Sequence, residues 1–225
     1  MLEKILHAVA PQKSDHFVEI GPGEGALTAP LLAAAGTVEA IEVDRDLAAR
    51  LQSEYPALTV HRADALEFDF ARLPHGVRII GNLPYNISTP LLFHVARYAE
   101  RVRDLHFMLQ LEVVERMVAA PSTAAYGRLS VSLQARFRMK KLFNVSRGAF
   151  RPPPKVESAV VRLEPRFPPL EVNEDLVRRA FSARRKTLRN ALPEVDFAAA
   201  GIDAGLRAEN LSPADYARLS MNSIL

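Results

Sequence analysis

Short apolar runs alternate with stretches of mixed polarity through the first half of the chain. The runs predict strands at residues 16–20, 37–42, 58–61, 77–82 and 105–110. Between them, apolar residues recur at helical spacing and predict helices at residues 1–10, 26–35, 46–54 and 89–100. Strands that alternate with helices are typical of a doubly wound parallel sheet, so we expect an α/β fold.

The second half of the chain has a different pattern. Residues 111–119 and 128–136 have helical spacing, whereas residues 141–145 and 158–163 predict an antiparallel pair of strands that closes the sheet around the loop 148–156. Pro165, Pro168 and Pro169 mark a linker. Helical patterns at residues 173–192, 197–200 and 213–221 follow it. We therefore expect a first domain, built on the sheet, over residues 1–165 and a small, all-helical domain over residues 170–225.

Composition excludes several classes of protein. The 225 residues include no Cys, which excludes disulfides and thiolate metal sites and fits a cytoplasmic location. The six His stand without ligand spacing, so we expect no metal. Residues 1–10 lack a cleavage site, and no apolar run approaches the roughly 18 residues of a membrane span. We expect neither a signal peptide nor a membrane partner, and nothing in the sequence indicates an obligate interface, so we expect a monomer.

The net charge of +3 conceals a strong asymmetry along the chain. Residues 1–115 hold 10 Lys or Arg against 16 Asp or Glu, whereas residues 116–156 hold 9 basic residues and no acidic one. Lys and Arg gain free energy by releasing counterions from phosphates. A basic middle therefore favours a nucleic acid partner, although a solvated positive face is the alternative.

A glycine-rich segment follows the first predicted strand and opens the first helix of the sheet. Glu19 precedes a G-x-G-x-G pattern in which Gly21 and Gly23 would let a ligand approach the backbone closely. Glu42 ends the second strand, 21 positions after Gly21, where an acidic residue commonly holds ribose hydroxyls. Asp64-Ala65 follows the third strand. Asp64 could accept a hydrogen bond from an adenine amino group, or it could cap the next helix. The set predicts an adenosine-type ligand.

The charge of this loop bears on which cofactor it holds. A nicotinamide cofactor would place a pyrophosphate on the helix N-terminus, where Glu24 would repel it. S-adenosyl-L-methionine has no phosphate and carries an ammonium group, which suits Glu19 and the acidic front half. We therefore favour S-adenosyl-L-methionine, with a nicotinamide oxidoreductase as the alternative. Methyl transfer from a sulfonium mainly needs alignment and desolvation, so no His base or metal is required.

The segment Asn82-Leu83-Pro84-Tyr85 comes directly after the apolar run at residues 77–81. Pro ends the predicted strand, which leaves an amide and an aromatic ring at its carboxyl end. Asn82 can accept a hydrogen bond from an exocyclic amine and Tyr85 can stack on a flat base. The alternative is an ordinary turn, because Asn and Pro are common turn residues.

Several motifs together resemble the KsgA/Dim family of ribosomal RNA adenine dimethyltransferases. They are residues 19–28, Glu42-Val43-Asp44, Asp64-Ala65, residues 82–85, Gln110-Leu111-Glu112 with Glu115-Arg116, and residues 126–130, 150–158 and 184–190. The resemblance runs from about Phe17 to the C-terminus. It implies a Rossmann-like class I methyltransferase domain followed by a small helical domain.

The resemblance also implies a reaction and a set of site residues. Family members place two N6 methyl groups on each of two adjacent adenines near the 3′ end of 16S rRNA in the small (30S) ribosomal subunit. By this resemblance Asn82 and a carbonyl of the Leu83-Pro84 turn would accept hydrogen bonds from the adenine N6 amine. Tyr85 and Phe150 would clamp the base by stacking. The cofactor residues would be Glu19, Gly21, Gly23, Glu42, Asp64, Ala65 and Asn82.

Contacts with RNA would come from basic residues in two regions. We expect them from Arg116, Arg147, Arg151, Lys155, Arg184, Arg185, Lys186 and Arg189, with Arg136, Arg138, Lys140 and Lys141 beside them. The segment 184–190 favours the small-subunit enzymes over the related methyltransferases that act on 23S rRNA.

Family members carry a basic N-terminal segment ending in Gln-Asn-Phe-Leu, and nothing like it precedes Leu2. Because that segment covers the methionine end of the cofactor, we expect weakened cofactor affinity and low or absent activity for this chain. A small-subunit assembly factor that binds immature subunits with little methyl transfer is therefore a rival hypothesis.

Overall fold

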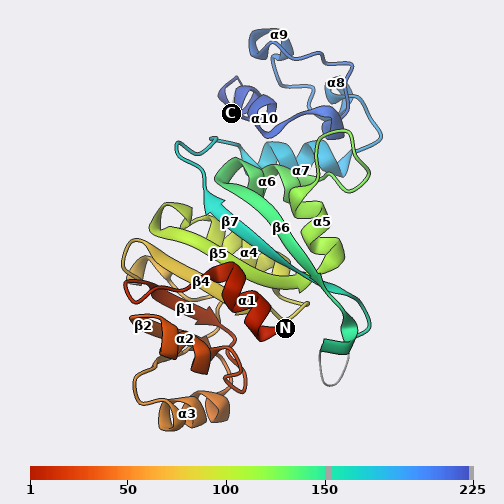
Figure 1. Ribbon diagram of the computed structural model, residues 1–225. Helices are drawn as coiled ribbons and strands as arrows, with labels where there is room; N and C mark the ends of the chain where they lie inside the picture. Colours follow the sequence, from red (N-terminus) through yellow and green to blue (C-terminus); the bar gives the residue numbers. More distant parts are fainter. Residues whose placement is uncertain (150–153, 223–225) are drawn as a thin grey trace. The chain divides into compact units, whose positions relative to one another are not determined.

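The computed structural model describes residues 1–149 and 154–222, and seven strands within them form one sheet (Figure 1). The strands are β1 (His16–Ile20), β2 (Thr37–Glu42), β3 (Thr59–Arg62), β4 (Val77–Asn82), β5 (Val102–Gln110), β6 (Phe137–Val145) and β7 (Ser158–Pro165). Their order is β3-β2-β1-β4-β5-β7-β6. The pairs from β3 to β5 are parallel and β7 runs antiparallel to β5. The expected α/β fold is confirmed.

The chain divides into two compact units. The first comprises residues 1–114 and 140–165, and the second comprises residues 115–139 and 166–225. Residues 115–139 stand within the range that we expected for the first domain, yet they group with the C-terminal segment.

The first unit is the sheet with its helices. They are α1 (Leu2–Val9), α2 (Thr28–Ala34), α3 (Arg45–Glu54), η1 (Phe70–Arg72), α4 (Ser88–Ala96), η2 (Ala99–Arg101), the start of α5 (Leu111–Val118) and η3 (Arg147–Ala149). Ile5 and Val9 of α1 are buried with Phe17 of β1 and Met108 of β5. The helix that the spacing predicted is therefore present, and its apolar side packs on one face of the sheet.

The second unit has its own apolar core. Its helices are the rest of α5, α6 (Arg128–Arg136), α7 (Glu174–Ser182), α8 (Leu188–Ala191), α9 (Phe197–Ala200), η4 (Ala208–Asn210) and α10 (Pro213–Met221). Tyr126 and Tyr216 are fully buried in this core, and their hydroxyls donate to the carbonyls of Leu211 and Ala208 at 2.8 and 2.9 Å. Buried hydroxyls that are paired in this way join the loops to the helices.

One predicted helix is wrong. Residues 173–192 form two helices, because α7 ends at Ser182 and α8 begins at Leu188. The backbone N–H groups of Leu188 and Arg189 donate to the carbonyls of Leu206 and Ala204 instead of continuing a helix. Pairing with a distant segment has overridden local helix propensity here.

The observed ends of some elements also differ from the predicted ends by a few residues. β5 begins at Val102 and β6 at Phe137, both earlier than predicted. The expected closing pair is present, since β6 lies next to β7 at the end of the sheet. Within the described residues, no helix is both long and apolar enough to cross a bilayer.

Candidate active site

The carboxyl ends of the parallel strands bring most of the predicted site residues to one edge of the sheet. The glycine loop follows β1, Glu42 ends β2 and Asn82 ends β4. Because β2, β1 and β4 are adjacent and parallel, these three ends meet. The edge is where ligands bind in sheets of this kind.

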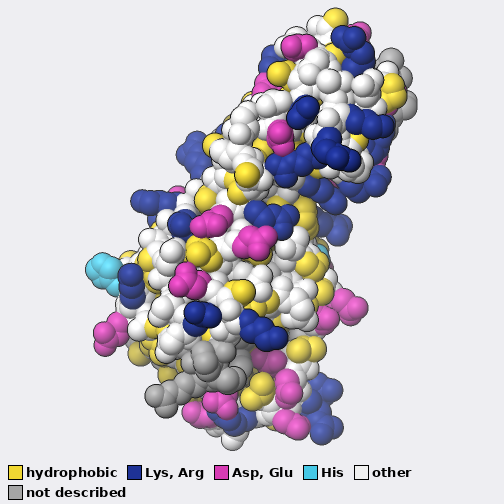
Figure 2. Space-filling model, turned by 90° about the vertical axis from the view of Figure 1, so that its right-hand side faces the viewer, with side chains coloured by type: hydrophobic (Ala, Val, Ile, Leu, Met, Phe, Trp, Pro, Cys, Tyr) yellow, Lys and Arg dark blue, Asp and Glu magenta, His cyan; other side chains and the backbone are white. Residues whose placement is uncertain are grey.

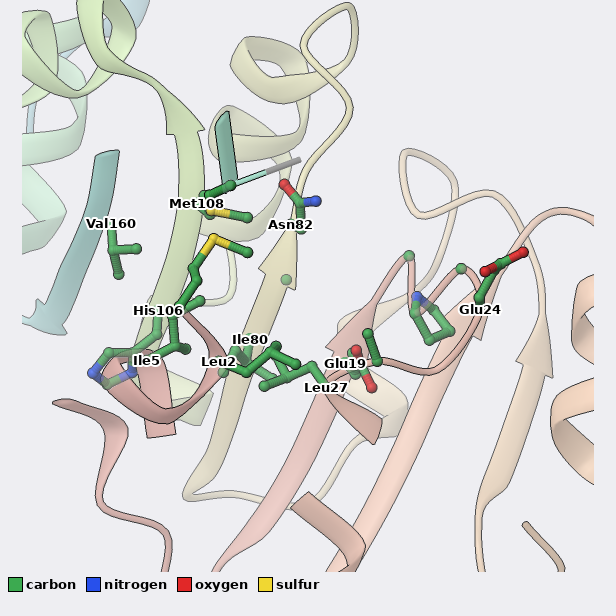
Figure 3. Close-up of a pocket in the computed structure, with 17 residues that line it drawn as sticks. Leu2, Ile5, Glu19, Glu24, Leu27, Ile80, Asn82, His106, Met108 and Val160 are labelled. Carbon is green, nitrogen blue, oxygen red and sulfur yellow. The ribbon is translucent and has the colours of Figure 1, made fainter. Parts of the chain in front are cut away.

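A pocket of about 460 Å³ opens at this edge (Figure 3). Four of the predicted residues line it, namely Glu19, Gly21, Gly23 and Asn82. The rest of the lining is mainly apolar and includes Leu2, Ile5, Leu27, Ile80, Met108, Val160 and also His106. In Figure 3 the Asn82 and Met108 side chains lie close together, while the His106 ring lies beside Ile5. The pocket has the mixed apolar and polar lining of a small-molecule site.

The glycine loop is shaped for close approach by a ligand. Gly21 and Gly23 have φ of 66° and 56°, in the left-handed region that side chains disfavour. A Cβ at either position would meet nothing within 4 Å, so the space before the loop is open. A bare backbone therefore faces the pocket.

Glu19 is the buried acid of the pocket. Its side chain is 3% exposed, and its carboxylate accepts a hydrogen bond from the Thr28 hydroxyl at 2.6 Å. Burial, and then the nearby charge of Glu42, raise the pKa of Glu19 to about 7. A buried carboxylate of this kind is stabilised most by a ligand that carries a positive charge.

Glu42 supports the loop. Its carboxylate accepts from the N–H groups of Gly23 at 3.3 Å and Asp44 at 3.0 Å. Asp64 is exposed and accepts a hydrogen bond from the Leu66 N–H at 2.8 Å within a turn. The next helix, η1, begins at Phe70 and is capped by Asp69, so the alternative role of Asp64 as its cap is wrong. Neither Asp64 nor the buried Ala65 lines the pocket of Figure 3. A role for Asp64 and Ala65 at the cofactor stays a prediction.

The Asn82 turn is held by backbone bonds. The N–H of Leu83 donates to the Met108 carbonyl at 3.2 Å, which extends the pairing of β4 with β5. The Pro84 carbonyl accepts from the Ser88 hydroxyl at 2.9 Å and from the Ile87 N–H at 3.2 Å. Of the two carbonyls in this turn, the one at Leu83 is therefore the better acceptor for a ligand.

The Asn82 and Tyr85 side chains differ in how they are held. Within residues 1–149 and 154–222, the exposed Asn82 amide has no hydrogen-bond partner. Tyr85 is half-buried, and its hydroxyl shares a hydrogen bond of 2.8 Å with Ser158. Phe150, the expected second stacking ring, lies outside the described residues, as does Arg151.

The basic residues fall into two groups by their contacts. Arg184 donates to the Glu209 carboxylate at 2.6 Å and to the Ala124 carbonyl at 3.1 Å. Arg185, Lys186 and Arg189 are exposed and, in the described part of the chain, have no acidic partner. The remaining predicted cations, Arg116, Arg147 and Lys155, are also exposed. Figure 2 shows Lys and Arg side chains gathered over the second unit on the face that it displays.

Sequence reasoning missed part of the pocket. His106 and Met108 lie on β5 with the same spacing as Ile80 and Asn82 on β4, and they pair with them in register. The period of two in β5 predicts that residues 106 and 108 share a face. That face could be assigned to the pocket only once the strand order was known.

Comparison with known proteins adds a family to this geometry. The family model described as "Ribosomal RNA adenine dimethylase" matches residues 1–223. A protein of Thiobacillus denitrificans named "Ribosomal RNA small subunit methyltransferase A" is 57% identical, covering 96% of this chain and 89% of that protein. A protein of the same name from Nitrosospira multiformis is 54% identical, covering 96% and 88%.

Two solved structures share the fold over nearly the whole chain. A dimethyladenosine transferase from Plasmodium falciparum has a TM-score of 0.82 at 28% identity, covering 97% of this chain and 93% of that one. The 23S rRNA methyltransferase ErmE has a TM-score of 0.73 at 26% identity, covering 99% and 96%.

Proposed function

Because this chain belongs to the ribosomal RNA adenine dimethylase family, we propose that it dimethylates adenine N6 in small-subunit rRNA. The acceptors would be the two adjacent adenines near the 3′ end of 16S rRNA, and the methyl donor would be S-adenosyl-L-methionine. Such a substrate would place the enzyme with the ribosomes in the cytoplasm, where it would act as a monomer.

The choice of ribosomal subunit rests on similarity. The relatives named for the small subunit are 51–57% identical to this chain, whereas the 23S rRNA enzyme ErmE is 26% identical. The small-subunit relatives and ErmE are all named as rRNA methyltransferases, so the shared fold supports methyl transfer to rRNA. The higher sequence identity supports the small-subunit rRNA as the substrate.

The pocket fits S-adenosyl-L-methionine on three observations. Gly21 and Gly23 present bare backbone to open space, Glu19 is a buried carboxylate without a cationic partner among the described residues, and Glu42 holds the loop. Glu19 would face the positive end of the cofactor, and Glu42 would serve the ribose. When bound, the cofactor supplies a methyl group already activated on a sulfonium.

The residues of this chain would bind and align the acceptor. Asn82 and the Leu83 carbonyl would accept hydrogen bonds from the adenine N6 amine, which points its lone pair toward the cofactor. Tyr85 would offer a stacking face worth roughly 1–3 kcal/mol. The base must leave its stack to reach this turn, so an unpaired or splayed adenine is the preferred substrate.

Binding of the rRNA would depend on the exposed cations. Arg185, Lys186 and Arg189 are exposed and would contact phosphate, as would Arg116, Arg147 and Lys155 of the remaining predicted set. Phosphate contacts of this kind give affinity without sequence information, so Asn82 and its turn would carry the specificity for adenine.

The single observation that carries the proposal is the exposed Asn82 amide at the mouth of the cofactor pocket, which has no hydrogen-bond partner in the described part of the chain. The test is transfer of labelled methyl groups to small subunits that lack the two dimethyladenines. We expect slow but measurable transfer by the wild type, in keeping with the low activity expected from its sequence, and a further loss of at least about 100-fold for Asn82→Ala, since alignment of the acceptor supplies much of the rate. The matched control, Asn144→Ala, changes an exposed Asn of β6 and should keep the wild-type rate.

Two outcomes would count against the proposal. Equal transfer by Asn82→Ala would remove this turn from the mechanism. Tight binding of immature subunits without any methyl transfer by the wild type would instead select the assembly-factor hypothesis.

A further inference from the structure

A hydrogen bond joins the proposed base-stacking ring to Ser158, the last residue of the motif 150–158, to which the sequence assigned no role. The Tyr85 hydroxyl and the Ser158 hydroxyl are 2.8 Å apart, although the two residues are 73 positions apart in the chain. Ser158 is the first residue of β7 and is 1% exposed. Tyr85 is half-buried, so its ring is partly open to a ligand while its hydroxyl is anchored.

Both ends of this bond are fixed by the same sheet. Ser158 pairs with Gln110 at the end of β5. One residue beyond this pair, the Leu111 N–H donates to the Glu157 carbonyl at 2.9 Å, so the two chain segments stay hydrogen-bonded past the strand end. On the other side, the Asn82 turn is attached to β5 through Met108. β5 therefore lies between the two partners and holds them at a constant separation.

Anchoring at the hydroxyl has a geometric consequence for the ring. The Tyr85 Oη atom lies at the far end of the ring from Cβ, so a bond there fixes the direction of the ring's long axis. Without it, the half-buried ring could leave its position by rotation about χ1, which is the ordinary freedom of a Tyr side chain. A stacking platform must keep its place within a few tenths of an ångström for the acceptor nitrogen to stay in line.

We infer that Ser158 is a positioning residue for methyl transfer, which holds the Tyr85 ring in the orientation that stacks on the target adenine. The inference rests on the proposed function and deepens it. It also predicts which quantity changes when the hydrogen bond is lost. A displaced ring lowers the rate of methyl transfer, because the adenine is misaligned in the reactive state, and has less effect on the affinity for the cofactor at the glycine loop.

The experiment is a double-mutant cycle on methyl transfer. Single-turnover rates with labelled S-adenosyl-L-methionine and undermethylated small subunits are measured for wild type, Ser158→Ala, Tyr85→Phe and the double variant. Each single variant removes one hydroxyl of the same bond. We expect each to slow transfer about tenfold, and the double variant to be no slower than either, since one shared interaction is lost. Ser53→Ala, at an exposed position on α3, is the control and should keep the wild-type rate.

Further readouts separate positioning from folding and from the proposed function itself. Calorimetric affinity for the cofactor should change less than about twofold in both single variants. A wild-type rate for Ser158→Ala, or losses that multiply in the double variant, would overturn the inference and leave the proposed function intact. If Ser158→Ala does not fold, Tyr85→Phe breaks the same bond from the half-buried side and decides alone. Absence of transfer by the wild type would overturn both.

Discussion

Replacing Arg78 with Met would remove the cation from a buried ion cluster in the first unit. The guanidinium of Arg78 donates to both carboxylate oxygens of Asp104 at 2.9 and 3.0 Å and to Asp15 at 2.7 Å. It also donates, at 2.8 Å, to the carbonyl of Val9, which is the last residue of α1. The side chains of Arg78, Asp15 and Asp104 are 4%, 1% and 1% exposed, so water cannot take over these contacts.

The loss in the free energy of unfolding depends on which partners of Asp15 and Asp104 remain in the variant. Breaking a buried ion pair by removing one partner commonly costs 3–5 kcal/mol. Asp15 would keep Arg103 at 2.8 Å and the Gln12 N–H at 2.9 Å. Among the described residues, Asp104 would keep the longer approaches of Arg162 at 3.5 Å and His106 at 3.6 Å. Because some partners remain, we expect Arg78→Met to lower the free energy of unfolding by about 3 kcal/mol at neutral pH.

The loss should depend on pH with a definite sign. Burial alone would raise the pKa of Asp104, but the His106 ring 3.6 Å away and the hydrogen bonds from Arg78 hold it at about 2, below its ordinary value of 3.8. A carboxyl with a depressed pKa stabilises the fold above its unfolded pKa and loses this contribution as the pH falls. The difference between wild type and Arg78→Met should therefore shrink as the pH falls from about 4 toward about 2.

The assay is urea unfolding followed by far-ultraviolet circular dichroism at pH 7 and at acidic pH. Arg45→Met is the matched control, because Arg45 pairs with Asp46 where both side chains are exposed, at 72% and 88%. It should stay within about 0.5 kcal/mol of wild type. A loss of less than about 1 kcal/mol for Arg78→Met, or a loss equal to that of the control, would refute the reasoning.

Three further predictions test other parts of the molecule. Gly81→Ala would place a Cβ 2.7 Å from the Ile20 carbonyl oxygen and push β4 from β1, so urea unfolding should show a loss of about 1–3 kcal/mol and transfer should fall with it. The pKa of Glu19 is raised to about 7 by burial and by Glu42, so calorimetry should show cofactor affinity falling as the pH drops below 7. Glu19→Gln should bind weakly and lose that pH dependence. Arg184→Ala should lower the urea midpoint because it breaks the contact with Glu209, whereas Arg185→Ala should keep the midpoint and weaken RNA binding at low salt. Equal midpoints for these two Arg variants would contradict the division of the basic residues into Arg184, which is paired with Glu209, and the exposed group that includes Arg185.

Much of the site was predictable because its signals are local. The apolar run of β4 and the Pro that follows it fixed where Asn82 and Tyr85 stand, and the glycine pattern fixed where the loop opens. Parallel strands place their carboxyl ends at one edge, so Glu19, Gly21, Gly23 and Asn82 could be expected to meet. The family resemblance rests on these same motifs and is confirmed.

Local pattern failed where a distant segment decided the outcome. Residues 183–187 have helix-forming neighbours, yet α7 ends at Ser182, and at the start of α8 the N–H groups of Leu188 and Arg189 donate to the carbonyls of residues 206 and 204. Likewise, nothing near residues 115–139 indicates that they group with the C-terminal segment rather than with the sheet that precedes them.

The sequence by itself determined the α/β fold, the family and the placement of the Asn82 turn beside a glycine loop. Only the tertiary structure decided that Ser158 anchors Tyr85, that Arg78 joins Asp15 to Asp104, and that His106 lines the pocket. The reason is the range of the forces involved. Periodicity and turn chemistry act over a few residues, whereas these contacts join positions that become neighbours only when the sheet takes the order β3-β2-β1-β4-β5-β7-β6.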